Sequence, residues 1–261
     1  NIFTKLLYMK KLLILLFSLL ISFNSYGGLF DKTVCVETNA QMRNGVIYLP
    51  NETKPFTGKN LCKYENGQNK NEGKVKGGKL DGKWTEWYHN GQYKSERKVK
   101  DGKLDGKLTK WHENGQIEEE GKYKDGKLVS ETKFDYHRNG QKKSEKNYNG
   151  YGELEGKYTS WHKNGQIEME ATYKDGKEDG KSICWESNGQ QSCEVNSKDG
   201  KRDGTWEGWY KNGQKRHEVN YKDGKKDGKF IWFYDSGRVK SEAIFKDDKC
   251  ISGDCNHFKS W

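Results

Sequence analysis

The chain has 261 residues, a formal net charge of +10 and 13% aromatic residues. Leu, Ile, Val and Phe together number only 45, and 14 of these lie in the first 27 residues, so the rest of the chain cannot fill a large hydrophobic core. The aromatic content, the modest charge for this length and the presence of only two prolines nevertheless argue against a disordered chain.

The N-terminal segment is typical of an export signal. The basic stretch MKK at 9–11 precedes an apolar run at 12–23 that is too short to span a bilayer comfortably. We predict a signal peptide over residues 1–27, with residues 1–8 upstream of a true start at Met9; the alternative is a buried N-terminal helix. Removal of the segment takes away three lysines and no acid, so the net charge falls from +10 to +7.

A unit of 24 or 25 residues then repeats along most of the chain. Its marker is an Asn-Gly step that begins at residues 66, 90, 114, 139, 164, 188 and 212, and Ser236-Gly237 continues the series. A fixed period of this length predicts a repeat architecture.

Each Asn-Gly step predicts a β-hairpin, because a type I′ turn needs a positive φ at both central residues and Asn-Gly accepts it most readily. One example is the pair of strands expected at 83–88 and 92–99, after which the stretch from Asp101 to Gly106 returns the chain. The sequence therefore predicts an all-β fold, an elongated single-layer antiparallel β-meander (β-hairpin solenoid) of about eight repeats.

The motif W-Y-x-N-G-Q, then E, then Y-K-D-G-K-x-D-G-K resembles the variant MORN repeat (membrane occupation and recognition nexus) over about residues 56 to 249. Bacterial members are often catalogued as YwqK-type antitoxins. The resemblance implies a binding array without a shared activity, flanked here by an N-terminal cap at 28–55 and a C-terminal cap at 250–261. Val129-Ser130 and the insertion at 149–152 depart from the motif, so we expect a bend or bulge near residues 129–156.

Two columns of side chains follow from the period. Three residues before the turn lies an aromatic residue: Trp87, Trp111, Tyr136, Trp161, Trp185, Trp209 and Phe233. Six residues after the turn lies a glutamate: Glu72, Glu96, Glu120, Glu145, Glu170, Glu194, Glu218 and Glu242. We interpret the aromatic column as a stack that supplies most of the cohesion, with a ligand platform as the alternative.

Period-two alternation assigns side chains to the two faces of the sheet. Trp87, Thr85, Lys94 and Glu96 are expected on one face. Trp84, Tyr88, Tyr93 and Val99 are expected on the other.

The glutamates are expected to be structural, accepting hydrogen bonds or pairing with lysines. Equivalent residues of adjacent repeats lie about 9.5 Å apart, too far for two carboxylates to share a calcium ion. The same spacing argues against a metal site at His112, His137 and His162. A carboxylate pair of the glycosidase kind fits this distance, but eight equivalent copies do not make one active site. We therefore predict no catalytic residues, no metal site, no cofactor and no enzymatic activity.

Six cysteines in an exported chain suggest disulfides. Around Asn188-Gly189, with 187 and 190 as the flanking pair, Cys184 lies opposite Cys193 at a non-hydrogen-bonded site where side chains approach closely. A cross-strand bridge between these two cysteines is expected. The caps offer two more pairs, Cys250 with Cys255 and Cys35 with Cys62, and zinc binding is the competing interpretation.

The Asp-Gly loops carry more lysine than aspartate, which gives the array a possible basic edge. The lysines that flank the loops are Lys100, Lys103, Lys124, Lys127, Lys174, Lys177, Lys198, Lys201, Lys222 and Lys225. Such an edge suits an acidic partner, an anionic membrane or a cell-wall polymer, while a solvated surface that resists aggregation is the simpler interpretation. Nucleic acid is disfavoured, because the intervening aspartates weaken a phosphate track.

Two functions are consistent with these features. The first is an exported (periplasmic, cell-surface or secreted), non-catalytic scaffold that binds another protein or an envelope component. The alternative is an antitoxin or immunity protein that neutralises a cognate toxin, as the family resemblance implies. Aromatic repeats that bind choline or glucan are a third class, but the repeated N-G-Q and glutamate do not match them.

Overall fold

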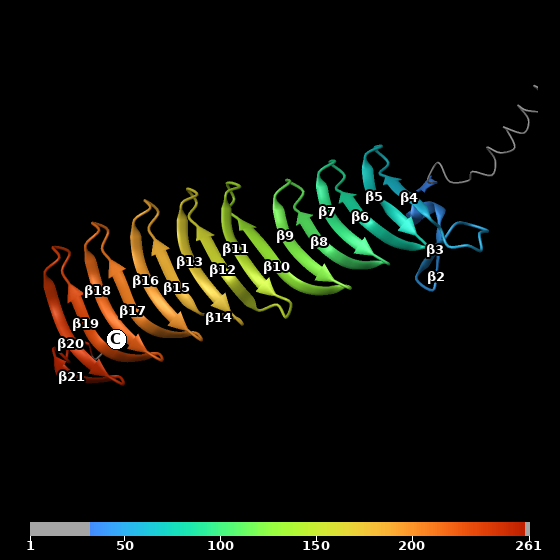
Figure 1. Ribbon diagram of the computed structural model, residues 1–261. Coiled ribbons are helices and arrows are strands. Elements are labelled where there is room, and N and C mark those ends of the chain that lie inside the picture. Colours follow the sequence, from blue (N-terminus) through green and yellow to red (C-terminus); the bar gives the residue numbers. More distant parts are fainter. Residues whose placement is uncertain (1–31, 259–261) are drawn as a thin grey trace, which may run out of the picture. The chain divides into compact units, whose positions relative to one another are not determined.

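A computed structural model describes residues 32–258 and contains two compact units, one that ends at Gly91 and one that begins at Gln92. Strands dominate both units (Figure 1). The predicted signal peptide and its start site Met9 lie outside the described residues. No helix within residues 32–258 is long and apolar enough to cross a membrane.

The first unit is a small meander with an N-terminal cap. Its elements are β1 (Thr33–Val34), α2 (Val36–Asn39), β2 (Gln41–Arg43), β3 (Val46–Tyr48), β4 (Gly58–Lys63), β5 (Asn69–Lys76) and β6 (Lys79–Trp87). Strands β4, β5 and β6 pair antiparallel in chain order, and β1 adds to β4 as a parallel strand. Ile47, Leu49 and Phe56 from the cap pack with Val75 of β5 as the hydrophobic core of this unit.

The second unit is a longer meander of the same kind. Its strands are β7 (Tyr93–Lys100), β8 (Lys103–Trp111), β9 (Ile117–Lys124), β10 (Lys127–Tyr136), β11 (Lys142–Asn149), β12 (Leu154–Trp161), β13 (Ile167–Lys174), β14 (Lys177–Glu178), β15 (Gly180–Trp185), β16 (Gln191–Lys198), β17 (Lys201–Trp209), β18 (Lys215–Lys222), β19 (Lys225–Phe233), β20 (Val239–Lys246) and β21 (Lys249–Gly253). Each strand pairs antiparallel with the next, except that β14 and β15 both pair with β13. The predicted all-β antiparallel meander is confirmed.

The Asn-Gly steps form a different turn from the predicted type I′. In the first repeat, Gly67 N donates to Tyr64 O at 2.9 Å and Tyr64 N donates to Gln68 O at 2.8 Å. Gly67 adopts φ +84°, whereas Asn66 keeps a negative φ. This is a three-residue loop, a type I turn closed by a glycine in the left-handed region. The prediction was wrong because it placed both residues of the dipeptide in that region.

The type I′ turns lie at the other end of each repeat. Asp101 and Gly102 have φ values of +51° and +80°, and Lys100 pairs directly with Lys103 across them. The second dipeptide, Asp105-Gly106, lies inside β8 and does not turn the chain. The expectation that the whole stretch from 101 to 106 forms the return was therefore wrong.

The second Asp-Gly dipeptide instead makes a β-bulge. Between β7 and β8 the register passes from Val99 opposite Leu104 to Arg97 opposite Leu108, so β8 contains two more residues than β7 between these pairs. The same surplus of two occurs between β5 and β6, β11 and β12, β16 and β17, and β18 and β19. An even surplus leaves every side chain on its original face of the sheet.

The aspartate of this bulge joins one repeat to the next. The Asp203 carboxylate accepts the backbone N–H of Asp223 at 3.0 Å, and Asp179 accepts that of Asp199 at 3.2 Å. At Asp105 the inter-repeat partner is the Lys124 ammonium, 2.9 Å away. This lysine, followed by the Asp125 backbone amide, holds the pKa of Asp105 below its ordinary value despite a smaller opposing effect of burial.

The C-terminal end of the second unit is closed by aromatic packing. Phe258 is 1% exposed and packs edge-on against Phe230 and Phe245, which are themselves buried. Val219 and Ala243 complete this hydrophobic cluster. The segment that contains Phe258 therefore covers the hairpin of β19 and β20 with side chains.

Three disulfides link the cysteines in the pairs expected from the sequence: Cys35–Cys62, Cys184–Cys193 and Cys250–Cys255. The register that places Cys184 opposite Cys193 differs from the predicted one, however. Glu186 N donates to Gln190 O, so residues 186 and 190, and not 187 and 190, close the loop. A bulge between Cys184 and Trp185 then restores the pairing of the two cysteines.

Replacement of both Cys184 and Cys193 by serine should lower the free energy of unfolding of the second unit by about 2 to 3 kcal/mol, because the bridge closes a short loop in the unfolded chain. Urea denaturation without reductant, monitored by tryptophan fluorescence, measures this loss. An unchanged midpoint would show that the hairpin persists in the unfolded state.

The bulge aspartates should make stability sensitive to acid. Because the folded pKa of Asp105 and Asp227 is depressed, their contribution is present above the unfolded value of about 3.9 and is lost as pH falls through the folded value. Replacing both by asparagine should therefore reduce the difference between denaturation midpoints at about pH 7 and about pH 3. Asp101→Asn, at a turn position that asparagine tolerates, is the control and should leave that difference as in the wild type.

Candidate binding site

The glutamate column lies on one face of the sheet and is largely paired with lysines. The ion pairs and their N–O distances are Lys107–Glu120 2.7 Å, Lys142–Glu145 2.9 Å, Lys157–Glu170 2.5 Å, Lys181–Glu194 2.5 Å, Lys215–Glu218 2.7 Å and Lys229–Glu242 3.2 Å. Glu72 lies opposite Thr85, and Glu96 lies opposite Thr109. Because most of these lysines are half exposed, each pair contributes at most about 1 kcal/mol to stability.

The aromatic column shares the face of the glutamates, and all its members are half-buried: Trp87, Trp111, Tyr136, Trp161, Trp185, Trp209 and Phe233. Buried rings lie on the face opposite the column, at Trp84 in the first unit and at Phe230 and Phe245 in the second. The cohesion attributed to the column is thus shared with a second set of aromatic side chains.

A bulge beside each Asn-Gly turn places one residue on the opposite face of the sheet from the face predicted for it. Trp111 pairs with Ile117, three residues after the turn, so that position shares the face of the aromatic column. Tyr93, the equivalent residue of the preceding repeat, accordingly has its ring centroid 5.6 Å from that of Trp111. Its predicted place on the face opposite the aromatic column was wrong.

The residues two before each turn form an inter-repeat ladder that the sequence analysis missed. His137 Nε2 lies 2.7 Å from Trp161 O, and His162 Nε2 lies 2.8 Å from Trp185 O. Tyr210 donates in the same way to Phe233 O at 2.8 Å. His137 and His162, which share a column with His112 in the sequence, thus hold neighbouring backbones. Within residues 32–258 no cluster of three or more His, Cys, Asp or Glu side chains is placed to hold a metal ion.

The turn asparagines form a second ladder beside the first. Asn139 Nδ2 donates to Lys163 O at 2.7 Å and Asn212 Nδ2 donates to Asp235 O at 2.7 Å, each in the next repeat. Asn139 Oδ1 also accepts the backbone N–H of Gln141 at 3.1 Å. The N-G-Q motif is therefore a device that joins consecutive turns.

The lysines of the predicted basic edge flank the type I′ turns and are exposed: Lys100, Lys103, Lys124, Lys127, Lys174, Lys177, Lys198, Lys201, Lys222 and Lys225. Lys124 is paired with Asp105, and the equivalent Lys246 is paired with Asp227 at 2.8 Å. Aspartates therefore neutralise part of this edge.

One repeat departs from the common register. In the other inter-repeat pairings of the second unit, the residue six after a turn lies opposite the residue five before the next turn, as Glu96 lies opposite Thr109. Between β9 and β10, Glu120 lies opposite Thr132, which is seven residues before Asn139. The bulge at Val129 adds one residue to β10, whereas the equivalent bulges of the other repeats add two. The repeat from Asn114 to Asn139 is also 25 residues long, one residue longer than the preceding repeat. The turn at Asn139 therefore extends two residues, about 7 Å, further out.

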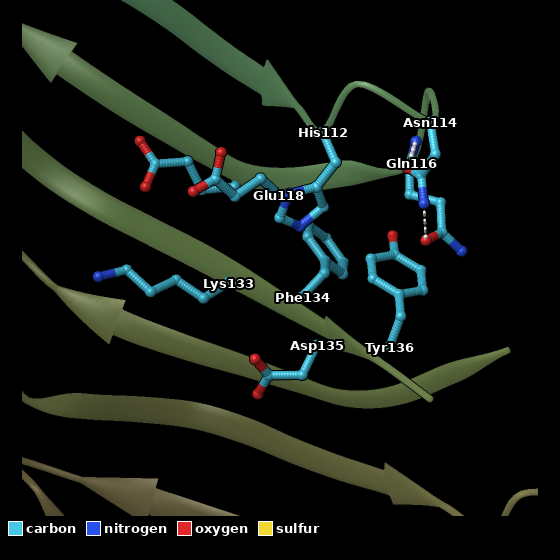
Figure 2. A pocket seen from close by; sticks show the side chains of 9 residues that line it. His112, Asn114, Gln116, Glu118, Lys133, Phe134, Asp135 and Tyr136 are labelled. Atoms are coloured by element: carbon cyan, nitrogen blue, oxygen red, sulfur yellow. Dashed lines mark hydrogen bonds between the residues drawn. The ribbon is translucent and has the colours of Figure 1, made fainter. Parts of the chain in front are cut away.

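This offset opens a hollow of about 480 Å³ between β9 and β10 (Figure 2). The β9–β10 register ends at Lys133 opposite Glu119, so residues 134–136 flank residues 116–118 without strand pairing. The hollow is lined by His112, Asn114, Gln116, Glu118, Glu119, Lys133, Phe134, Asp135 and Tyr136.

The offset also takes polar side chains out of the ladders. The imidazole of His112 lies edge-on to the Tyr136 ring, with centroids 6.3 Å apart. Asn114 Nδ2 donates to Gln116 Oε1 of its own turn at 2.9 Å, as the dashed line in Figure 2 shows. Tyr136 donates its hydroxyl to Ile117 O at 2.9 Å, which satisfies a β9 carbonyl beside the hollow. His112 and Asn114 are thereby available at the surface in a way that their repeat equivalents are not.

The charged groups of the hollow are unequally paired. Glu119 pairs with Lys110 at 2.5 Å, and Lys133 pairs with Glu131 at 3.0 Å. Hydrogen bonds from Ser144 and Lys146 hold the pKa of Asp135 below its ordinary value, so it stays ionised. Burial raises the pKa of Tyr136, which keeps its hydroxyl protonated. No ion pair among the described residues engages Glu118 with lysine or arginine.

Comparison with solved structures adds little. The crystal structure of TcdB2-TccC3-Cdc42 matches at 12% identity and TM-score 0.23, over 75% of this chain and 13% of that one. The crystal structure of TcdB2-TccC3 matches at 12% identity and TM-score 0.20, over 77% and 14%. This chain thus spans about one seventh of the length of those structures, and scores this low support no inference. No curated protein sequence matches the chain.

The repeats themselves match a known family. The model of the MORN repeat variant matches residues 80–101, 104–125, 154–175, 202–223 and 226–247. The matches pass over residues 126–153, which contain the offset hairpin, and residues 176–201, which contain the cross-strand disulfide. Each matched range contains one Asn-Gly or Ser-Gly turn. The five matched repeats of this chain belong to the MORN repeat variant family.

Proposed function

We propose that this chain is an exported, non-catalytic scaffold that binds another protein, and that the hollow between β9 and β10 is the centre of its binding surface. MORN repeats suggest a repeat scaffold or binding protein. The observation that carries the proposal is the two-residue offset, which makes this part of the surface unlike every regular repeat of the second unit.

The chemistry of the hollow supports binding more than catalysis. Asp135 is held ionised by Ser144 and Lys146, which suits a fixed charge and not a general acid whose pKa must lie near the working pH. The aromatic walls at Phe134 and Tyr136 offer the rigid, partly apolar contact area that is enriched at protein interfaces.

Export is supported by the three disulfides, which suggest an oxidising compartment. The predicted signal peptide is consistent with it. We expect the protein isolated from its host to lack residues 1–27 and to show no free thiol under denaturing conditions. Mass spectrometry of the intact chain and thiol titration measure both properties. Six reactive thiols would contradict the assignment.

An exchange of one strand tests the binding site. Replacing residues 127–136, KLVSETKFDY, by KLDGKLTKW from residues 103–111 should restore the regular bulge and spacing and close the hollow. The matched control places the same KLDGKLTKW in residues 79–87, which already have the regular two-residue bulge and differ from it only at residues 84 and 86. We expect the first exchange to abolish retention of a partner from an envelope fraction and the control to preserve it.

The result distinguishes the remaining possibilities. If the variant with residues 127–136 exchanged still retains the partner, the binding surface lies on the regular repeats. Retention of anionic vesicles that is lost at moderate salt would point to the lysine edge. The antitoxin alternative is a special case of protein binding, and it requires that the retained protein is a toxin whose effect on growth is relieved by co-expression in the same compartment.

A further inference from the structure

We propose that the hollow between β9 and β10 binds a cationic side chain, an arginine in particular, of the protein partner. The inference rests on the proposed function and specifies the chemistry that the site recognises. It follows from the local charge, from the aromatic walls and from Glu118, the carboxylate lining the hollow that forms no ion pair among the described residues.

The hollow is locally acidic in a basic protein. The segment HENGQIEEE at 112–120 contains four glutamates and no lysine or arginine, whereas the whole chain has a net charge of +10. Glu119 and Glu120 are neutralised by Lys110 and Lys107. Glu118 makes no ion pair with a lysine or arginine among the described residues, and the nearby Lys110, which its charge also stabilises, is paired with Glu119.

Aromatic rings line the same hollow as Glu118. The Tyr136 ring is held by its hydroxyl bond to Ile117 O, and His112 lies edge-on against it. Figure 2 shows Phe134 below the imidazole of His112. A guanidinium over such rings gains a cation–π attraction, and a nearby carboxylate adds to it.

The chain already uses this contact internally. The guanidinium carbon of Arg202 lies 4.0 Å from the Trp206 ring centroid, and the Lys142 ammonium lies 4.9 Å from that of Phe134. A volume of about 480 Å³ lies in the range of ligand pockets and accommodates a guanidinium with its methylene stem. An anion, by contrast, would meet Glu118 and Asp135 without a free cation, since Lys133 is paired with Glu131.

The test is a nuclear magnetic resonance titration of the oxidised full chain with N-acetyl-arginine amide, using N-acetyl-citrulline amide as the neutral isostere and N-acetyl-glutamate as the anion. We expect the arginine probe to shift the backbone amides of residues 116–118 and 134–136 with millimolar affinity. The citrulline probe should bind several-fold more weakly, and the glutamate probe should leave these signals unmoved.

Two matched substitutions locate the charge that acts. Glu118→Gln should weaken binding of the arginine probe by about threefold, the loss expected for one exposed ion pair. Glu168→Gln, at the same repeat position, should have no effect, because Glu168 lies in a regular repeat beside Ser160 and His162. Equal binding of arginine and citrulline, a stronger response to glutamate, or the same affinity after Glu118→Gln would each overturn the inference.

The outcomes separate this inference from the proposed function. If the strand exchange leaves partner capture intact while the arginine probe still binds the wild type, the hollow is a cation site but not the partner surface. If the exchange abolishes capture while the arginine probe fails to bind the wild type, the hollow is the partner surface. The inference that it recognises arginine is then wrong.

Discussion

The register between consecutive hairpins is the constraint on which the rest of the second unit depends. A slip of one residue would carry every side chain of a strand to the opposite face. The bulge at the second Asp-Gly dipeptide adds two residues and so keeps this parity, as the passage from Val99–Leu104 to Arg97–Leu108 illustrates. The glutamate–lysine pairs, the half-buried tryptophans and the buried rings each keep their face because of it.

Much of the fold could be predicted from the period alone, and the errors have a common physical origin. Asn-Gly and Asp-Gly both tolerate the left-handed region, so the dipeptides alone do not reveal which end of a repeat takes the type I′ turn. At Asn188-Gly189 the three-residue loop shifts the pairing by one residue, and the bulge beside Trp185 shifts it back. Cys184 therefore faces Cys193 even though the assumed loop was wrong.

The candidate site was harder to predict. The sequence marked Val129-Ser130 as irregular, but whether the bulge takes one residue or two depends on how β9 and β10 settle against each other. Residues 134–136 become accessible because the bulge adds one residue and not two. The two ladders were missed for a related reason: a histidine or asparagine that recurs with the repeat suggests a ligand column, whereas its partner is a backbone carbonyl of the next repeat, as at Trp161.

The offset of two residues explains how a repeat protein can acquire one distinct site without losing its sheet. An even offset preserves both faces, so Glu120 still lies on the side of Thr132 and the sheet continues through β10 and β11. The loss of strand pairing is confined to the ends of β9 and β10 near the Asn-Gly turns. There the Tyr136 hydroxyl donates to the Ile117 carbonyl, which would otherwise face the hollow without a strand partner. His112 and Glu118 are then left beside a fixed ring, each without the bond that its equivalent makes in a regular repeat, as His162 makes to Trp185 and Glu168 to Ser160. The one hollow described in the second unit thus lies where the register is offset by an even number of residues.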